Sequence, residues 1–138
     1  MKRAMLLLIL LGTPDSARAQ QDARAFDGTW DVTVACAQQP GGVLPYTYKF
    51  VAEVKEGVLH AQHGSPGSEA SLTLDGKIAP DGSALLEARG VTGNPSHNTR
   101  RGASNRPYSY RVAARFEGAK GTGRRLEVRA CDVTFVKR

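Results

Sequence analysis

The strongest constraint on how this chain folds is a period of two in its hydrophobic residues. Trp30, Val32, Val34 and Cys36 alternate with small or polar residues along one run. Further runs of this kind occupy residues 46–55, 58–62, 72–78, 84–91, 108–117 and 131–135. Because successive side chains of a strand point to opposite faces, each run has one face for a core and one for solvent. The pattern predicts an all-β protein.

Turn signals separate these runs. Lys55-Glu56-Gly57 and the Pro-Asp-Gly sequence of residues 80–82 are typical of tight turns. They leave seven or eight strands spaced by about 8 to 12 residues, which fits a closed up-and-down barrel, a two-sheet β-sandwich or a five-stranded Greek-key barrel. A membrane barrel fits less well, because about 119 residues leave little room for eight membrane-spanning strands and their loops.

The first 19 residues predict a secretory signal peptide. Two basic residues follow Met1, residues 4–12 are apolar, and residues 17–19 have the small-x-small pattern that signal peptidase recognises. The apolar stretch is too short for a membrane-spanning helix. We therefore expect residues 20–138 to form a single exported domain without a transmembrane segment, periplasmic by default and otherwise secreted.

The two cysteines, Cys36 and Cys131, discriminate between the β architectures. In an exported protein, an even number of cysteines favours a disulfide. Cys36 lies on the first predicted strand and Cys131 on the last, and both share the parity of the inward apolar residues. A bridge between them would join the two outermost strands of a barrel and remove both free edges. We therefore predict a small antiparallel up-and-down barrel of about eight strands, with the two-sheet β-sandwich as the alternative.

Charge is distributed unevenly along the chain, whose formal net charge is +6. Residues 20–89 contain 5 basic and 9 acidic side chains, whereas residues 100–138 contain 11 basic and 3 acidic ones. One sector of the folded surface should therefore be basic.

Four arginines in this sector are candidates for a binding patch. They are Arg111 and Arg115 on one predicted strand, and Arg125 and Arg129 on the next stretch of chain. Hairpin pairing would place the four guanidinium groups side by side, where they would bind phosphate, carboxylate or sulfate groups. In the alternative, these arginines pair across strands with Glu117 and Glu127 and keep the protein soluble.

One long irregular segment, residues 92–107, is rich in Gly, Asn, Pro, Ser and Thr. Its basic side chains are His97, Arg100, Arg101 and Arg106. Loops longer than about 12 to 15 residues are uncommon in compact domains, and they are either functional or solvated connections. As a functional loop, the segment would act together with the neighbouring tyrosines. The candidate binding residues are Tyr46, Tyr48, Arg100, Arg101, Arg106, Tyr108, Tyr110 and Arg111.

The sequence carries no recognisable catalytic or metal-binding pattern. His60 and His63 have the spacing of a metal pair on a helix, but on a strand they point to opposite faces, and we interpret both as exposed imidazoles. Residues 64–68 form a Gly/Ser/Pro connection rather than a nucleophile elbow. Residues 121–123, Gly-Thr-Gly, lack the third glycine and the helix of a phosphate loop. We therefore expect no metal, no cofactor and no enzymatic activity.

Several short motifs are spread along the chain. They are Phe26-Asp27-Gly28-Thr29-Trp30, Glu56-Gly57-Val58-Leu59, Leu72-Thr73-Leu74-Asp75-Gly76, Asp81-Gly82, Thr92-Gly93, Pro107-Tyr108, Phe116, Gly121-Thr122-Gly123-Arg124 and Arg129-Ala130-Cys131. Together they resemble a family of small exported β-proteins of proteobacteria, over nearly all of residues 20–138. The resemblance implies an exported β fold and no particular activity.

The Gly-Thr-Trp start followed by hairpins is also similar in architecture to avidin-like and lipocalin-like barrels. Avidin-like pockets hold biotin between several tryptophans, whereas this chain has one, Trp30. No biotin-binding residue is therefore carried over. We expect Trp30 to close one end of the barrel, with its N–H bound to a carbonyl.

A non-enzymatic, exported binding module is the first functional hypothesis. A small ligand would lie in the mouth of the barrel among the four tyrosines, or an acidic partner surface would bind the basic loop. Nucleic acid is not an expected partner outside the cytoplasm. The alternative hypothesis is an inhibitor of a secreted hydrolase, with residues 92–106 as the inhibitory loop.

Overall fold

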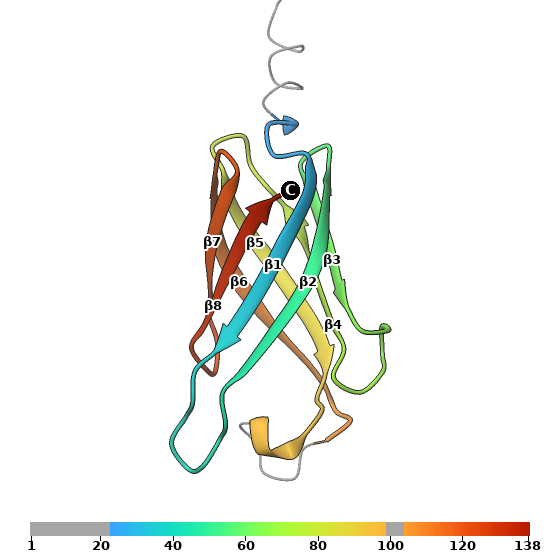
Figure 1. Cartoon of the computed structure of the whole chain (residues 1–138), viewed down its shortest axis with the longest axis vertical. Coiled ribbons are helices and arrows are strands. Elements are labelled where there is room, and N and C mark those ends of the chain that lie inside the picture. Colours follow the sequence, from blue (N-terminus) through green and yellow to red (C-terminus); the bar gives the residue numbers. More distant parts are fainter. Residues whose placement is uncertain (1–22, 99–103) are drawn as a thin grey trace, which may run out of the picture.

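Eight antiparallel strands form a closed barrel in which each strand pairs with its neighbours in sequence and the first pairs with the last. The computed structural model describes residues 23–98 and 104–138, so the predicted signal peptide, residues 1–19, lies outside the described residues. The strands are β1 Gly28–Cys36, β2 Tyr46–Lys55, β3 Val58–His63, β4 Leu72–Lys77, β5 Ser83–Val91, β6 Pro107–Glu117, β7 Lys120–Arg125 and β8 Cys131–Lys137 (Figure 1). The up-and-down barrel is thereby confirmed, and the two-sheet sandwich is not formed.

The seam between β1 and β8 closes the barrel. Their register runs from Trp30 opposite Lys137 to Cys36 opposite Cys131. The two cysteines form the predicted disulfide, with their Cα atoms 4.0 Å apart. Since β1 also pairs with β2 along its other edge, no backbone edge of β1 is left for pairing with another chain.

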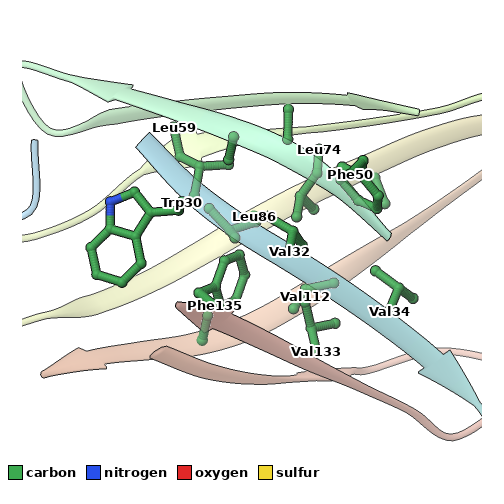
Figure 2. Close-up of a cluster of buried hydrophobic side chains, with 14 of the residues drawn as sticks. Trp30, Val32, Val34, Phe50, Leu59, Leu74, Leu86, Val112, Val133 and Phe135 are labelled. Carbon is green, nitrogen blue, oxygen red and sulfur yellow. The ribbon is translucent and has the colours of Figure 1, made fainter. Parts of the chain in front are cut away.

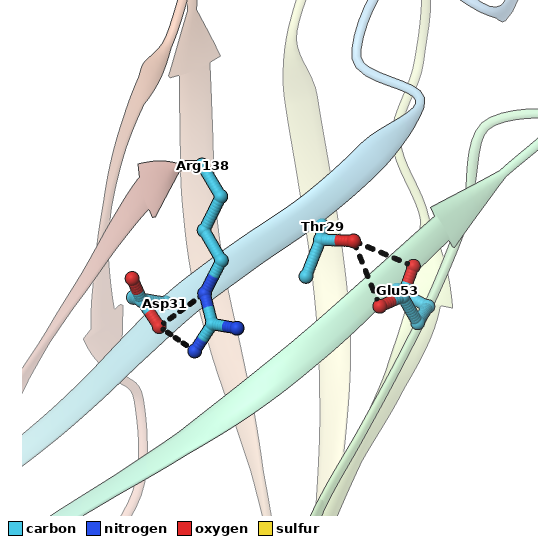
Figure 3. Close-up of polar contacts among 4 residues, drawn as sticks. All are labelled: Thr29, Asp31, Glu53 and Arg138. Atoms are coloured by element: carbon cyan, nitrogen blue, oxygen red, sulfur yellow. Dashed lines mark hydrogen bonds and ion pairs between the residues drawn. The ribbon is translucent and has the colours of Figure 1, made fainter.

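Polar pairs on the outer face join β1 to the chain on both of its sides. The guanidinium of Arg138 binds the carboxylate of Asp31 at 2.7 Å, and the hydroxyl of Thr29 donates to the carboxylate of Glu53 on β2 (Figure 3). Arg138 holds the pKa of Asp31 below its ordinary value, chiefly through its hydrogen bond. Because these pairs are solvent-exposed, they mark the outer face of the barrel but contribute little to its free energy of unfolding.

Apolar side chains from every strand except β7 fill the interior (Figure 2). Trp30 is fully buried near one end, where its Nε1 donates to the backbone oxygen of Phe26 at 2.9 Å. The ring of Phe116 packs edge-on against Trp30, with centroids 5.3 Å apart, and Phe135 packs against Phe116 at 4.7 Å. This aromatic group confirms the predicted role of Trp30, and we call this end the closed end.

The two ends of the barrel differ in their connections. At the closed end the strands are joined by short turns, such as Glu56 and Gly57, both with positive φ, whose backbone N–H groups bind the carboxylate of Asp27. The opposite end carries the three longest connections, residues 37–45, 64–71 and 92–106, together with the connection 126–130 and the 3-10 helix η1, Pro95–His97 (Figure 1). We call it the loop end. Within the described parts of the chain, no helix is long and apolar enough to cross a membrane.

Replacing Cys36 and Cys131 together with alanine tests the contribution of the seam disulfide. The bridge closes a loop of 95 residues, so its loss should lower the free energy of unfolding by about 2 to 4 kcal/mol. Urea unfolding of the wild type and the double variant, followed by circular dichroism, measures this difference. We expect the variant to keep the native near-ultraviolet spectrum, because the rest of the β1–β8 register remains. An unchanged urea midpoint would contradict the prediction.

Candidate functional site

All four tyrosines of the chain lie on the inward face of the barrel at its loop end. Tyr46 and Tyr48 are on β2, and Tyr108 and Tyr110 are on β6. In an eight-stranded ring, these two strands belong to opposite walls. The pairs are compact, with ring centroids 5.0 Å apart on β2 and 6.0 Å apart on β6. Tyr110 is buried and the other three are half-buried, and we call the four the tyrosine cluster.

The two pairs influence each other across the interior. Tyr46 and Tyr48 of β2 each act electrostatically on Tyr108 and Tyr110 of β6 and raise the pKa of both phenols, although burial is the larger cause. Burial also raises the pKa of Tyr46 and Tyr48. All four phenols are therefore protonated at neutral pH and are able to donate hydrogen bonds.

Two imidazoles extend the aromatic surface. His63 of β3 stacks on Tyr48, with ring centroids 4.2 Å apart, and His97 of η1 meets the edge of Tyr46 at 6.3 Å. The interpretation of His63 as exposed is thus wrong, because it has the inward parity of β3 and the end of the barrel leaves room for its ring. His60 does face solvent, where it pairs with Asp75.

Two guanidinium groups lie over rings of the cluster. The Cζ atom of Arg125 is 3.9 Å from the centroid of the Tyr110 ring, and that of Arg129 is 5.1 Å from the Tyr46 ring. Both distances are in the range of cation–π contacts. Arg129 is only 5% exposed.

The predicted patch of four arginines is therefore not formed. Arg111 and Arg115 are on the outer face of β6, whereas Arg125 pairs with the inward-facing Val112. Gly121 and Gly123 occupy the other inward positions of β7, so the sequence of this strand shows no alternation of apolar and polar side chains. A Cβ atom at either position would come within 2.8 or 2.9 Å of neighbouring side chains.

Arg129 joins three connections of the loop end. Its Nη1 donates to the backbone oxygen of His97 at 2.8 Å, and its Nη2 donates to the backbone oxygens of Ala37 and Leu44. The backbone N–H of Leu44 also donates to the oxygen of Ser96 at 2.8 Å. These bonds hold residues 37–45 and η1 against the β7–β8 connection, over the end of the barrel that the tyrosines line.

A strained turn positions Arg129. Val128 has a φ of +71°, and the N–H of Arg129 donates to the oxygen of Glu127 at 2.9 Å, which is the hydrogen bond of a γ-turn. A β-branched residue in this region is an outlier that costs of the order of 1 to 3 kcal/mol. Glu127 is fixed in turn by the backbone N–H of Arg111 at 2.8 Å and by its Nε at 2.5 Å.

The structure brings the four candidate tyrosines together but not the candidate arginines. Arg111 lies on the outer face and forms an ion pair with Glu127. This pair is one of those expected in the alternative in which the arginines pair with Glu117 and Glu127. Arg106 is exposed at the base of its loop, where its backbone N–H and oxygen bind the hydroxyl and N–H of Thr92. Arg100 and Arg101 lie outside the described residues.

The site consists of ring faces and hydrogen-bond donors. Phenols and guanidinium groups donate, and the rings stack on flat or apolar groups. Among the residues that the structure describes, no three His, Cys, Asp or Glu side chains lie close enough to hold a metal ion. The arrangement is therefore suited to an apolar or aromatic group with acceptor atoms.

Comparisons with protein-family models, with curated proteins and with solved structures each found no match. The resemblance drawn from the sequence motifs thus stays a prediction, and the interpretation of the loop end depends on its geometry.

Val128→Gly tests the strain at the γ-turn. Glycine adopts a positive φ without a steric penalty, but it loses more backbone entropy on folding than valine does. Since the relief of strain is the larger effect, the free energy of unfolding should rise by about 1 kcal/mol. Val128→Ala is the control, because it removes the branched side chain but keeps the Cβ atom, and we expect a smaller gain. Thermal unfolding measures all three proteins. A glycine variant that melts below the wild type would show that the turn is not strained.

Spectrophotometric titration tests the burial of the tyrosine cluster, since the protein has no other tyrosine. Raised pKa values in the folded state mean that, above pH 10, the native protein holds more protons than the unfolded chain. Stability from this source is complete below about pH 10 and falls as the pH rises further. We expect phenolate absorbance to appear above pH 10, together with loss of the circular dichroism signal. Reversible titration of all four phenols near pH 10 in the folded protein would contradict this.

Proposed function

We propose that this protein is an exported, non-enzymatic barrel that binds a small ligand at its loop end. The single observation that carries the proposal is the convergence of all four tyrosines, from opposite walls, at the end that has the long connections. Small barrels have interior space for side chains or for one small ligand, and their mouths are frequent binding sites.

The contrast between the two ends supports this proposal. At the closed end, Trp30 and Phe116 occupy the interior and are almost completely buried. At the loop end the inward positions carry tyrosines, and Tyr46, Tyr48 and Tyr108 keep part of their surface exposed. Aliphatic side chains would fill such positions with no polar atom to satisfy, whereas a tyrosine presents a large ring face and a hydroxyl to a ligand.

Two observations support export. The disulfide between Cys36 and Cys131 is of a kind that persists in oxidising compartments and is rare in the cytosol. The signal peptide predicted for residues 1–19 would direct the chain to such a compartment, the periplasm or the exterior.

Binding of phenylnaphthylamine, a neutral aromatic dye whose fluorescence rises in apolar surroundings, tests the proposal. We expect saturable binding to the full domain, and weaker binding by Tyr48→Ser and Tyr108→Ser because each removes a ring face. The matched control is Leu85→Ala, which removes a large side chain from the outer face of β5 and should leave binding unchanged. Absence of saturable binding, or equal loss in the Leu85 control, would overturn the proposal.

A further inference from the structure

We infer that the loop end selects ligands with an anionic oxygen group on an apolar body, such as a small aromatic or aliphatic acid, and that Arg125 and Arg129 bind the anion. The inference rests on the proposed function and adds the chemical class of the ligand. Its basis is the placement of the two guanidinium groups against the tyrosine cluster.

The two cations have no carboxylate partner within the described part of the chain. Its ion pairs are made by other arginines or by His60, and none includes Arg125 or Arg129. Glu127, which is next to them in sequence, binds Arg111 on the outer side through both the backbone N–H and Nε. Arg125 donates from its Nε to the backbone oxygen of Glu127 at 2.7 Å, and its charge helps to lower the pKa of the Glu127 carboxyl without forming an ion pair with it. Neither charge is therefore neutralised by the protein in a direct ion pair.

The two cations also act on each other and on the same phenol. Arg125 lowers the pKa of Arg129, in the same direction as burial, which is the larger cause. Both arginines act on Tyr46 and oppose the rise in its pKa that burial causes. Because arginine keeps its charge in proteins, the repulsion between two neighbouring guanidinium groups persists until an anion is bound between them.

One donor at the site has no acceptor. Arg129 is nine-tenths buried, and its Nε has no hydrogen-bond partner among the described residues, although both Nη atoms donate to backbone oxygens. A buried N–H without a partner costs about 1 to 3 kcal/mol. An oxygen of a ligand would satisfy this donor, and it would gain the strength of a charge-assisted bond.

The rings define the rest of the ligand. Tyr46, Tyr48 and His63 offer stacked or tilted ring faces on one wall, and Tyr108 and Tyr110 offer them on the other. A free inorganic anion would not contact the parts of these rings that stay exposed. The geometry therefore fits an acid with an apolar or aromatic body, held between the rings with its anionic group at the arginines.

A pair of dyes with one ring skeleton tests the inference. Anilinonaphthalene sulfonate carries the anionic group, and phenylnaphthylamine lacks it. We expect the sulfonate to bind the wild-type domain more tightly than the amine. Arg125→Gln should weaken the sulfonate about tenfold more than it weakens the amine, the effect of losing one charge-assisted bond.

The matched control is Arg124→Gln. Arg124 is the neighbour of Arg125 on β7, but its side chain faces outward and is 82% exposed. The substitution removes the same net charge, so both dyes should bind as they do to the wild type. A parallel loss of the sulfonate in Arg124→Gln and Arg125→Gln would show only a general charge effect, and it would overturn the inference.

The remaining outcomes separate the inference from the proposed function. If the amine binds and the sulfonate binds no more tightly, the loop end is a neutral site and only the inference fails. If neither dye binds, both fail. Displacement of the bound amine from the wild type by benzoate and by benzamide gives a measurement that needs no variant. We expect benzoate to displace the amine at a lower concentration, and equal displacement would overturn the inference even if Arg125→Gln does not fold.

Discussion

The pairing of β1 on both of its edges is the constraint on which the rest of the structure depends. β1 is hydrogen-bonded to β2 on one side and to β8 on the other, and the bridge between Cys36 and Cys131 fixes the register at one end of the seam. Closure assigns every strand residue to the inside or the outside. The inward position of the tyrosines on β2 and β6 is thus a consequence of the same ring that buries Trp30 at the opposite end.

The difference between the two ends follows from the connections. Strands that alternate up and down place four connections at the loop end and three at the closed end, and the longest ones are at the end where β1 finishes and β2 begins. Where the turns are short, side chains cover the end of the barrel, as those of Trp30 and Phe116 do. Long connections bring backbone oxygens over the interior, and these oxygens are the acceptors that hold Arg129.

Much of this architecture could be predicted from the sequence, because period-two patterning and the parity of the cysteines report directly on strands and closure. The tyrosines followed from the same parity. The inward position of Arg125 could not be predicted in this way. The other inward positions of its strand are glycines, which have no side chain to reveal the alternation. The register of β6 and β7, in which Arg125 lies opposite the inward-facing Val112, is what reveals its position. Arg129 carries no such signal, because it lies in a connection where no periodicity holds.

Two unfavourable local features meet at the loop end, the positive φ of Val128 and the burial of the Arg129 charge, and the second also ties three connections together. A glycine at residue 128 would relieve the positive φ. An apolar side chain at residue 129 would avoid the burial of a charge that forms no ion pair among the described residues, although it would lose the hydrogen bonds to the loop oxygens. Both alternatives are ordinary in a connection between two strands. Strain and buried charge of this kind accumulate where a site has to hold a group ready for a ligand. Their coincidence beside the tyrosine cluster is therefore a physical argument that supports the proposed binding at this end of the barrel.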